Sequence, residues 1–316
     1  MYRKIMGFLE AWKESEHRKP LILQGARQVG KTYSILEFGR THYENVAYFN
    51  FETNPKLNET FEENISPDYL IPILSHIAGQ TIVKEKTLIV FDEVQLCERA
   101  LTSLKYFCED APDYHIIVAG SLLGVAVNRA KFSFPVGKVD MKTLYPMDME
   151  EFMLALGEDD LVAQIKKCFQ TDTPLPSALH DAAMQLYRQY LVVGGMPECV
   201  MQFAETKDYI LVRHTQDTIL ASYLNDMSKY NNLNEIKKTR LAYDNITVQL
   251  SKKNTRFQYK LIKKGGRASE FENAIEWLCL SGIVSQVYKV EQIKKPLENY
   301  RDIDAFKIYV SDLGLL

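Results

Sequence analysis

The sequence has no long apolar run. Its uninterrupted apolar stretches fall well short of the ~20 residues that a membrane-spanning helix requires. Charged residues also interrupt the short apolar stretch within residues 1–14, where a secretory signal peptide would need an unbroken apolar segment. We therefore expect neither a transmembrane helix nor a signal peptide.

Cysteine is scarce and irregularly spaced. The five cysteines are odd in number and show no C-x-x-C spacing; they are Cys97, Cys108, Cys168, Cys199 and Cys279. Disulfide frameworks and structural zinc sites use regularly spaced or paired cysteines. The pattern indicates neither kind of site and favours the reducing cytoplasm as the location.

A large charge of one sign is also missing, since the formal net charge is −3. Hydrophobic residues make up 46% and charged residues 25%, which is ordinary for a folded globular protein. The length of 316 residues exceeds what one hydrophobic core usually organises. From changes in pattern along the chain we predict a first domain over residues 1–152, a helical lid-like segment over 153–223 and a third module over 224–316.

The first domain alternates short apolar runs with amphipathic stretches, which is the pattern of an α/β fold with a parallel sheet. Helical spacing connects the runs, as in residues 34–39, 68–77 and 100–109. The expected strands are Leu21–Gln24, Val46–Phe51, Thr87–Phe91, His115–Ala119 and Val139–Leu144.

A glycine-rich segment follows the first expected strand and precedes a helical pattern. It matches the phosphate-binding motif G-x-x-x-x-G-K-[ST] through Gly25, Ala26, Arg27, Gln28, Val29, Gly30, Lys31 and Thr32, with Tyr33 next. Backbone N–H groups of such a loop surround phosphate oxygens, while Lys31 neutralises the β and γ phosphates and Thr32 ligates Mg²⁺. The alternative is an ordinary glycine turn with an incidental lysine, which the strand and helix on either side disfavour.

Two adjacent carboxylates end the third expected strand. Asp92 is expected to hold Mg²⁺ directly or through water. Glu93 is placed to deprotonate the water that attacks the γ-phosphate. The alternative is a solvated acidic pair at the end of a strand. The presence of the phosphate-binding loop disfavours this alternative.

The fourth expected strand ends in Gly120 and Ser121, which a neighbouring strand would bring close to the γ-phosphate. Ser121 could polarise the attacking water, although Gly-Ser after a strand is often only a turn. No [NT]-K-x-D motif for guanine occurs, so ATP is the expected nucleotide. A small-molecule kinase is possible, but the Asp92–Glu93 pair favours hydrolysis.

The last module combines helical segments with two β-rich stretches, 283–290 and 305–310, which suggests a winged helix. Ser269 and Glu272 read as a capping box for a helix whose buried side chains are Phe271, Ile275 and Leu278. Seven cations interleaved with Phe257 and Tyr259 precede that helix and could contact nucleic acid; they are Lys252, Lys253, Arg256, Lys260, Lys263, Lys264 and Arg267. Acidic residues on the helix oppose major-groove reading, and solvated lysines on a domain-packing module are an equal alternative.

Together these segments resemble the AAA-type P-loop ATPases of bacteria and archaea that join an ATPase core to a helical segment, a winged helix and a further uncharacterised C-terminal domain. The resemblance covers nearly the whole chain. It rests on the segments 25–32, 87–95 (TLIVFDEVQ), 115–121, 144–152 and 190–197 (YLVVGGMP).

The resemblance implies a sheet with the phosphate-loop strand at its centre and the Ser121 strand beside it. It also implies that Gly195 and Pro197 contact adenine, with a plain helix-breaking turn as the alternative. Relatives commonly have Gly-Arg where this chain has Gly137-Lys138, which puts an arginine finger there in doubt; Arg129 lies nearby in sequence and could substitute. Relatives also usually continue past a segment such as 309–316, so the chain looks truncated.

The sequence therefore predicts an AAA-type molecular switch that binds and hydrolyses Mg·ATP and couples turnover to conformational change. The alternative is a nucleotide-gated module that binds DNA or a protein partner with little turnover. A place in a defence or toxin system has no support from individual residues. The partner and the oligomeric state are left open.

Overall fold

The computed structural model describes residues 1–121, 134–230, 233–253 and 255–316. Its contacts divide the chain into two compact units, Met1–Tyr145 and Pro146–Leu316. Among the described residues, no helix combines the length and the apolar character needed to cross a bilayer.

The first unit is built on a five-stranded sheet in which every pairing is parallel, in the order β2-β3-β4-β1-β5. This confirms the predicted parallel-sheet P-loop core. Its strands are β1 (Leu21–Gly25), β2 (Asn45–Asn50), β3 (Thr87–Asp92), β4 (His115–Ser121) and β5 (Asp140–Thr143). Its helices are α1 (Ile5–Lys13), α2 (Lys31–His42), α3 (Lys56–Glu63), α4 (Pro67–Ala78) and α5 (Glu98–Asp110), with a 3₁₀ turn η1 (Val94–Leu96).

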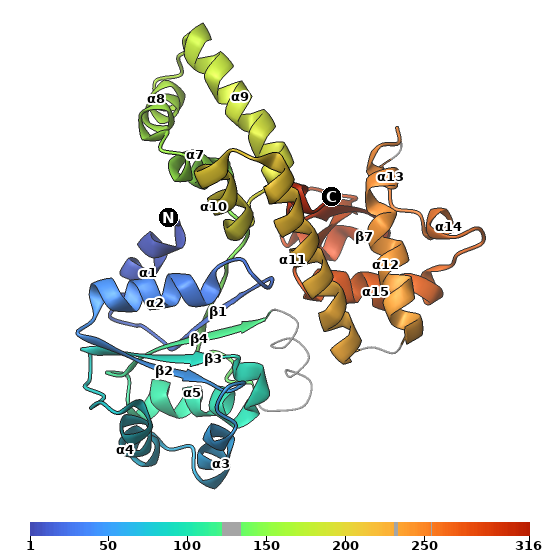
Figure 1. Ribbon diagram of the computed structural model, residues 1–316. Coiled ribbons are helices and arrows are strands. Elements are labelled where there is room, and N and C mark those ends of the chain that lie inside the picture. Colours follow the sequence, from blue (N-terminus) through green and yellow to red (C-terminus); the bar gives the residue numbers. More distant parts are fainter. Residues whose placement is uncertain (122–133, 231–232, 254) are drawn as a thin grey trace. The chain divides into compact units, whose positions relative to one another are not determined.

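Helices cover both faces of the sheet, α1 and α2 on one and α3, α4 and α5 on the other (Figure 1). The strand order explains this division. The chain moves from β1 outward to β2 and then returns through β3 to β4. Right-handed crossovers that run in opposite directions place their helices on opposite faces. The reversal leaves the carboxyl end of β1 next to that of β4, where ligands bind in open α/β sheets.

The core of the first unit contains a cluster of phenylalanine side chains packed edge to face. Phe91 of β3 lies 5.9 Å from Phe51 and 5.6 Å from Phe61 between ring centroids, and all three are almost fully buried. Such pairs stabilise by about 0.5–1.5 kcal/mol beyond the area that they bury. The residues of β3 are all buried, so this strand is held firmly from both faces up to Asp92.

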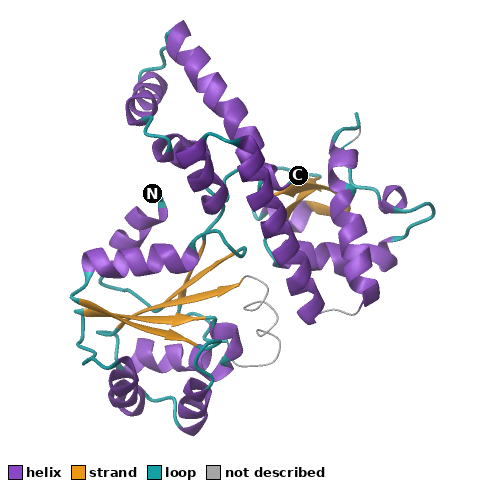
Figure 2. Cartoon of the chain, in the orientation of Figure 1, coloured by secondary structure: helices purple, strands orange, loops and turns teal. Residues whose placement is uncertain are grey.

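The second unit is mostly helical and contains one antiparallel hairpin, as Figure 2 shows. All of α7 (Met149–Ala155) belongs to it, and α11 (Tyr209–Tyr230) runs through residues 223 and 224 without a break. The three-domain division at 152/153 and 223/224 stays a prediction. The other elements are α8 (Asp159–Gln170), α9 (Ser177–Val193), α10 (Pro197–Thr206), α12 (Leu233–Asp244), α13 (Ile246–Leu250), α14 (Tyr259–Ile262), α15 (Ala268–Leu280), β6 (Val284–Val290), η2 (Leu297–Tyr300), β7 (Arg301–Val310) and η3 (Leu313–Leu315).

The start of α15 corrects the predicted capping box. The helix begins at Ala268, so Ser269 is its second residue and cannot act as its N-cap, and the N-cap residue Arg267 makes no side-chain cap. The buried stripe through Phe271, Ile275 and Leu278 is confirmed, because each side chain is at most 2% exposed. Helices followed by a hairpin fit a winged helix, which stays a prediction.

His115, the first residue of β4, is buried at the end of the sheet remote from the glycine-rich loop. Its Nδ1 lies 2.7 Å from the hydroxyl of Tyr43, while Nε2 has no hydrogen-bond partner among the described residues. Burial, followed by the charges of Arg18 and Lys13, lowers the pKa of His115 to about 4, with Asp113 opposing. A proton on the ring would leave a buried N–H without an acceptor, so His115 is neutral at neutral pH.

Acid is therefore expected to destabilise the first unit through His115. The folded pKa lies below the ordinary value of 6.5, so the unfolded chain binds more protons and stability falls as pH falls from about 6.5 to about 4. Between pH 7 and pH 5 we expect His115 to account for a loss of about 2 kcal/mol. His115→Leu should remove this contribution from the slope of the free energy of unfolding against pH.

Urea unfolding at both pH values tests this, followed by the fluorescence of Trp12, whose ring lies 6.2 Å from that of His115. The chain has two tryptophans, so a Trp277→Phe background isolates the signal of the first unit. His17→Leu at an exposed position serves as the control and should keep the parent slope. Equal slopes in the parent and His115→Leu would contradict the assignment.

Candidate nucleotide site

The loop between β1 and α2 approaches other backbone closely at its first glycine. A Cβ on Gly25 would lie 2.3 Å from the carbonyl oxygen of Leu144, so no larger residue fits there without a backbone shift. Gly30 has φ 88°, a left-handed conformation that costs glycine little. The two glycines of the motif therefore have steric reasons for their positions.

Helix α2 begins directly after Gly30, which has no side chain that could cap it. The first N–H groups of a helix have no partner within the helix, and the helix dipole adds positive potential there. An uncapped helix start behind a glycine loop is a general binding site for phosphate.

Lys31 is the first residue of α2, and its side chain turns back into the loop. Its Nζ donates hydrogen bonds to the carbonyl oxygens of Gly25 at 3.1 Å and Ala26 at 2.8 Å. Burial lowers the pKa of Lys31 to about 8, while Glu93 and then Asp92 oppose the shift. A phosphate beside this ammonium group would supply the counter-charge that the loop carbonyls only partly provide.

Thr32 and Asp92 meet although sixty residues separate them along the chain. The Thr32 hydroxyl donates to Oδ2 of Asp92 at 3.0 Å, which joins the start of α2 to the end of β3. Hydroxyl and carboxylate oxygens are ligands that Mg²⁺ accepts, and protein Mg²⁺ sites typically add phosphate and water. Within the described residues no three His, Cys, Asp or Glu side chains gather as a metal site, so this sparse pair fits an ion that arrives with a nucleotide.

Glu93 lies just beyond β3 in a left-handed conformation with φ 53°, which is uncommon for a residue with a side chain. Its N–H donates to Oδ1 of Asp92 at 3.0 Å, and its Oε2 accepts a hydrogen bond from Nε2 of Gln95. The two adjacent carboxylates thus have different partners. The left-handed turn of the backbone at Glu93 separates the two side chains.

The sequence matches a model of the AAA domain over residues 17–153 and a model of a domain of unknown function (DUF8612) over residues 184–316. Residues 17–153 thus match an AAA domain, and they have the fold of a P-loop NTPase core. No curated protein sequence matches it.

A solved structure of a Walker-type ATPase from Pyrococcus abyssi aligns with 99% of this chain and 94% of its own, at 13% identity and a TM-score of 0.60. At that identity the similarity shows the fold alone. Aeropyrum pernix ORC1 in complex with DNA aligns at 14% identity over 98% of this chain and 87% of its own, with a TM-score of 0.35. A Thermotoga maritima RuvB variant aligns at 13% identity over 97% and 90%, with a TM-score of 0.37. The last two scores are too low to carry an argument.

The other residues predicted for the AAA domain lie in different surroundings. Ser121 pairs with Gly25 in the β1–β4 register, so its backbone lies beside the start of the loop. Arg129 lies outside the described residues. Lys138, at the position where relatives have arginine, forms an ion pair with Glu109 at 2.9 Å.

The side chains of the glycine-rich loop differ in how far they are buried. Ala26 and Val29 are buried and fix the loop to the core, whereas Tyr33 on α2 is 57% exposed. Gln28 is exposed and Arg27 is half-buried. Gln28 also has φ 61°, which adds a second left-handed residue to the loop besides Gly30.

Three residues near the candidate nucleotide site belong to no sequence motif, and the sequence analysis did not identify them. Arg3 is buried and donates to the carbonyl oxygens of Val29 at 2.8 Å and Tyr145 at 2.7 Å. The bond to Val29 holds the backbone of the glycine-rich loop in place. Tyr48 and Asn50 at the end of β2 form hydrogen bonds that lead to Asp92. Polar side chains at the carboxyl end of a neighbouring strand were the available signal for the last two.

Gly195 and Pro197 belong to the second unit and form the turn between α9 and α10, with Pro197 as the first residue of α10. A Cβ on Gly195 would lie 2.0 Å from the Met147 carbonyl oxygen. The Gly195 N–H donates to Oδ2 of buried Asp312 at 2.5 Å. Burial raises the pKa of Asp312, and backbone bonds from Gly195 and Gly314 oppose the shift. Local packing alone accounts for Gly195, and the adenine contact stays a prediction.

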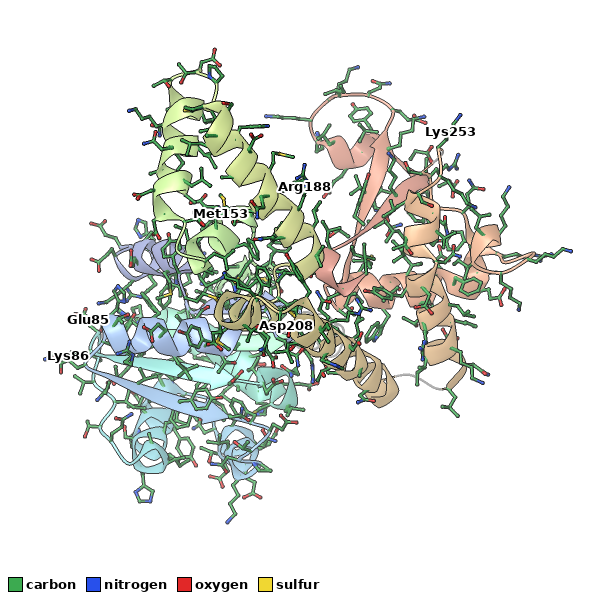
Figure 3. The ribbon with its side chains drawn as sticks, turned by 45° about the horizontal axis from the view of Figure 1, so that its top comes forward. Glu85, Lys86, Met153, Arg188, Asp208 and Lys253 are labelled. Atoms are coloured by element: carbon green, nitrogen blue, oxygen red, sulfur yellow. The ribbon has the colours of Figure 1, made fainter. Side chains whose placement is uncertain are left out.

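The predicted nucleic-acid segment, 252–267, has exposed cations but no exposed aromatic platform. Figure 3 shows Lys253 at the surface of the second unit, in the loop that follows α13. Phe257 is 5% exposed and stacks on Phe306 at 5.6 Å between centroids. Tyr259 is half-buried and packs against Phe257, so both aromatic rings contact neighbours within this unit. Nucleic-acid binding by the segment therefore stays a prediction that would rest on charge alone.

Two of the segment's cations have partners within the second unit. Lys263 pairs with Glu270 at 3.3 Å, and Arg256 donates to the carbonyl oxygen of Asp304 at 2.7 Å. The remaining predicted contacts are exposed; they are Lys252, Lys253, Lys260, Lys264 and Arg267.

Proposed function

We propose that the chain is an ATP-hydrolysing molecular switch in which Mg·ATP turnover in the AAA domain is coupled to conformational change. The hydrogen bond between Thr32 and Asp92 carries this proposal. It brings the hydroxyl of the phosphate-loop helix and the carboxylate of β3 together at one point. A glycine loop before an ordinary helix would not require a buried carboxylate there.

Each side chain has a separate role in the proposed reaction. Lys31 gives up its hydrogen bonds to the carbonyl oxygens of the loop and binds the β and γ phosphates. The N–H groups at the start of α2 orient these phosphates. Thr32 and Asp92 hold Mg²⁺, which neutralises charge that develops on the phosphate oxygens. Glu93 accepts the proton of the attacking water at a carboxylate oxygen. Ser121, whose backbone is next to Gly25, is the candidate to orient that water.

The environment of Glu93 supports its role as the base. Its bond with Gln95 fixes the direction of the carboxylate without neutralising it, because the amide of Gln95 carries no charge. Glu93 also interacts with the Lys31 ammonium, because its charge opposes the lowering of the pKa of Lys31 by burial. All five cysteines are free of disulfides, which supports a reducing, cytoplasmic location for the proposed switch.

Two measurements test the proposal with the intact chain. Steady-state phosphate release should depend on both ATP and Mg²⁺. Hydrogen exchange should differ between the ATP-bound and ADP-bound forms in backbone amides of residues 146–316, if turnover is coupled to the second unit. Release without Mg²⁺ dependence would contradict the assigned site, and identical exchange in the two forms would contradict the coupling.

A further inference from the structure

The phenol of Tyr48 forms a hydrogen bond with the carboxylate that we assign to Mg²⁺. Its hydroxyl donates to Oδ2 of Asp92 at 2.6 Å, the same oxygen that accepts from Thr32. We propose that Tyr48 is the positioning residue of Asp92, which orients this carboxylate for Mg²⁺ before the nucleotide binds. The inference rests on the proposed function and adds a residue that no motif identifies.

The register of the sheet explains how Tyr48 reaches the site. In the β2–β3 pairing Tyr48 lies opposite Val90, and Asn50 lies opposite Asp92. Tyr48 and Asn50 share one face of β2 because side chains alternate along a strand, while Phe49 between them is buried on the other face. The long phenol therefore extends two residues along β3 to its carboxyl end.

Asn50 determines the direction of the hydrogen bonds. Its Oδ1 accepts from the backbone N–H groups of Glu52 at 2.9 Å and Thr53 at 3.0 Å, which fixes the orientation of the amide. Its Nδ2 therefore faces Tyr48 and donates to the phenolic oxygen at 3.2 Å. With that oxygen acting as an acceptor from Asn50, the proton of Tyr48 is directed at Asp92.

The phenol keeps this proton at neutral pH. Burial, followed by the bond to Asp92, raises the pKa of Tyr48 to about 12. The geometry of the two bonds thus makes the hydroxyl the donor to Asp92. A hydrogen bond to a charged carboxylate is stronger than one between two neutral groups.

Asp92 is consequently held at both oxygens. Oδ2 accepts from Tyr48 and Thr32, and Oδ1 accepts from the N–H of Glu93. Hydrogen-bond partners of a metal ligand orient the ligand, and their removal typically lowers metal affinity about 10- to 100-fold. Tyr48 is 38% exposed, so its hydroxyl contributes to the orientation of Asp92 more than to the core.

Tyr48→Phe removes the hydroxyl and leaves the ring, and Tyr69→Phe is a matched control. Tyr69 is in the same unit and donates its hydroxyl to Glu63, so both variants lose one tyrosine–carboxylate bond. The readout is equilibrium binding of a fluorescent ATP analogue, titrated with Mg²⁺ and repeated in EDTA. Thermal unfolding of each variant is measured alongside.

We expect Tyr48→Phe to raise the half-saturating Mg²⁺ concentration about 10- to 100-fold. Its affinity in EDTA should equal that of the parent, and Tyr69→Phe should titrate like the parent. A parent midpoint in a folded Tyr48→Phe would overturn this inference alone. A parent protein that binds no Mg·ATP would overturn the proposed function, and the inference with it.

Discussion

Replacing Glu93 by Gln is expected to leave ATP binding intact and to lower single-turnover hydrolysis about 10²–10⁴-fold. The amide keeps the size of the side chain and can still accept the hydrogen bond from Gln95. It cannot take a proton from water. The loss should therefore be confined to the chemical step, which rapid-mixing hydrolysis and equilibrium ATP binding measure separately.

Glu44→Gln is the control for this experiment. Glu44 lies just before β2, at the end of the strand away from the site, and pairs with Lys86 on the surface. The same chemical change there should leave both binding and hydrolysis at the parent level. If Glu93→Gln hydrolyses ATP at the parent rate, Glu93 is not the base, and the proposal retreats to nucleotide binding.

Replacing Lys31 by Ala is expected to abolish measurable Mg·ATP binding while the fold persists. Removing one partner of a buried, hydrogen-bonded charge pair costs about 2–5 kcal/mol, so the dissociation constant should rise from about 30-fold to several thousand-fold. Removing the Lys31 side chain leaves no unpaired carboxylate in the described part of the core, because Nζ donates its hydrogen bonds to neutral carbonyl oxygens of the loop. Burial already lowers the pKa of Lys31, so stability should not fall when the side chain is removed.

Fluorescent ATP binding and thermal unfolding of the same samples test this expectation. Lys84→Ala is the matched control, since Lys84 pairs with Asp113 near the opposite end of the sheet. Its ATP affinity should match that of the parent. Unchanged affinity in Lys31→Ala would remove the nucleotide site from this loop, whereas an unfolded variant would contradict the assignment of Lys31 to ligand binding.

Much of the fold could be predicted from residue patterns, because those patterns are local. Each expected strand of the first unit agrees with an observed strand to within two residues at either end, since apolar runs between turn signals mark buried strands. Ser269 shows where this fails. A Ser-x-x-Glu pattern with Ser269 as the N-cap would start the helix at Glu270, but α15 begins at Ala268, so Ser269 lies inside the helix.

The candidate site was predictable to the extent that it lies in contiguous motifs. Lys31, Thr32 and Asp92 were identified from spacing, and the structure brings Thr32 and Asp92 together. Arg3 and Tyr48 were not identified. Neither has a neighbour in sequence that reveals its partner, and an arginine or a tyrosine alone is common on any surface.

The sequence by itself determined which chemical groups the nucleotide loop offers and that a parallel sheet carries them. Two glycines at a fixed spacing, a hydroxyl after a lysine and alternating apolar segments are properties of a few consecutive residues. Only the tertiary structure decided which distant groups meet, such as Tyr48 with Asp92, Arg3 with Val29 and Asp312 with Gly195. Those contacts depend on strand order, register and close packing between segments, and the local periodicity of the chain specifies none of these.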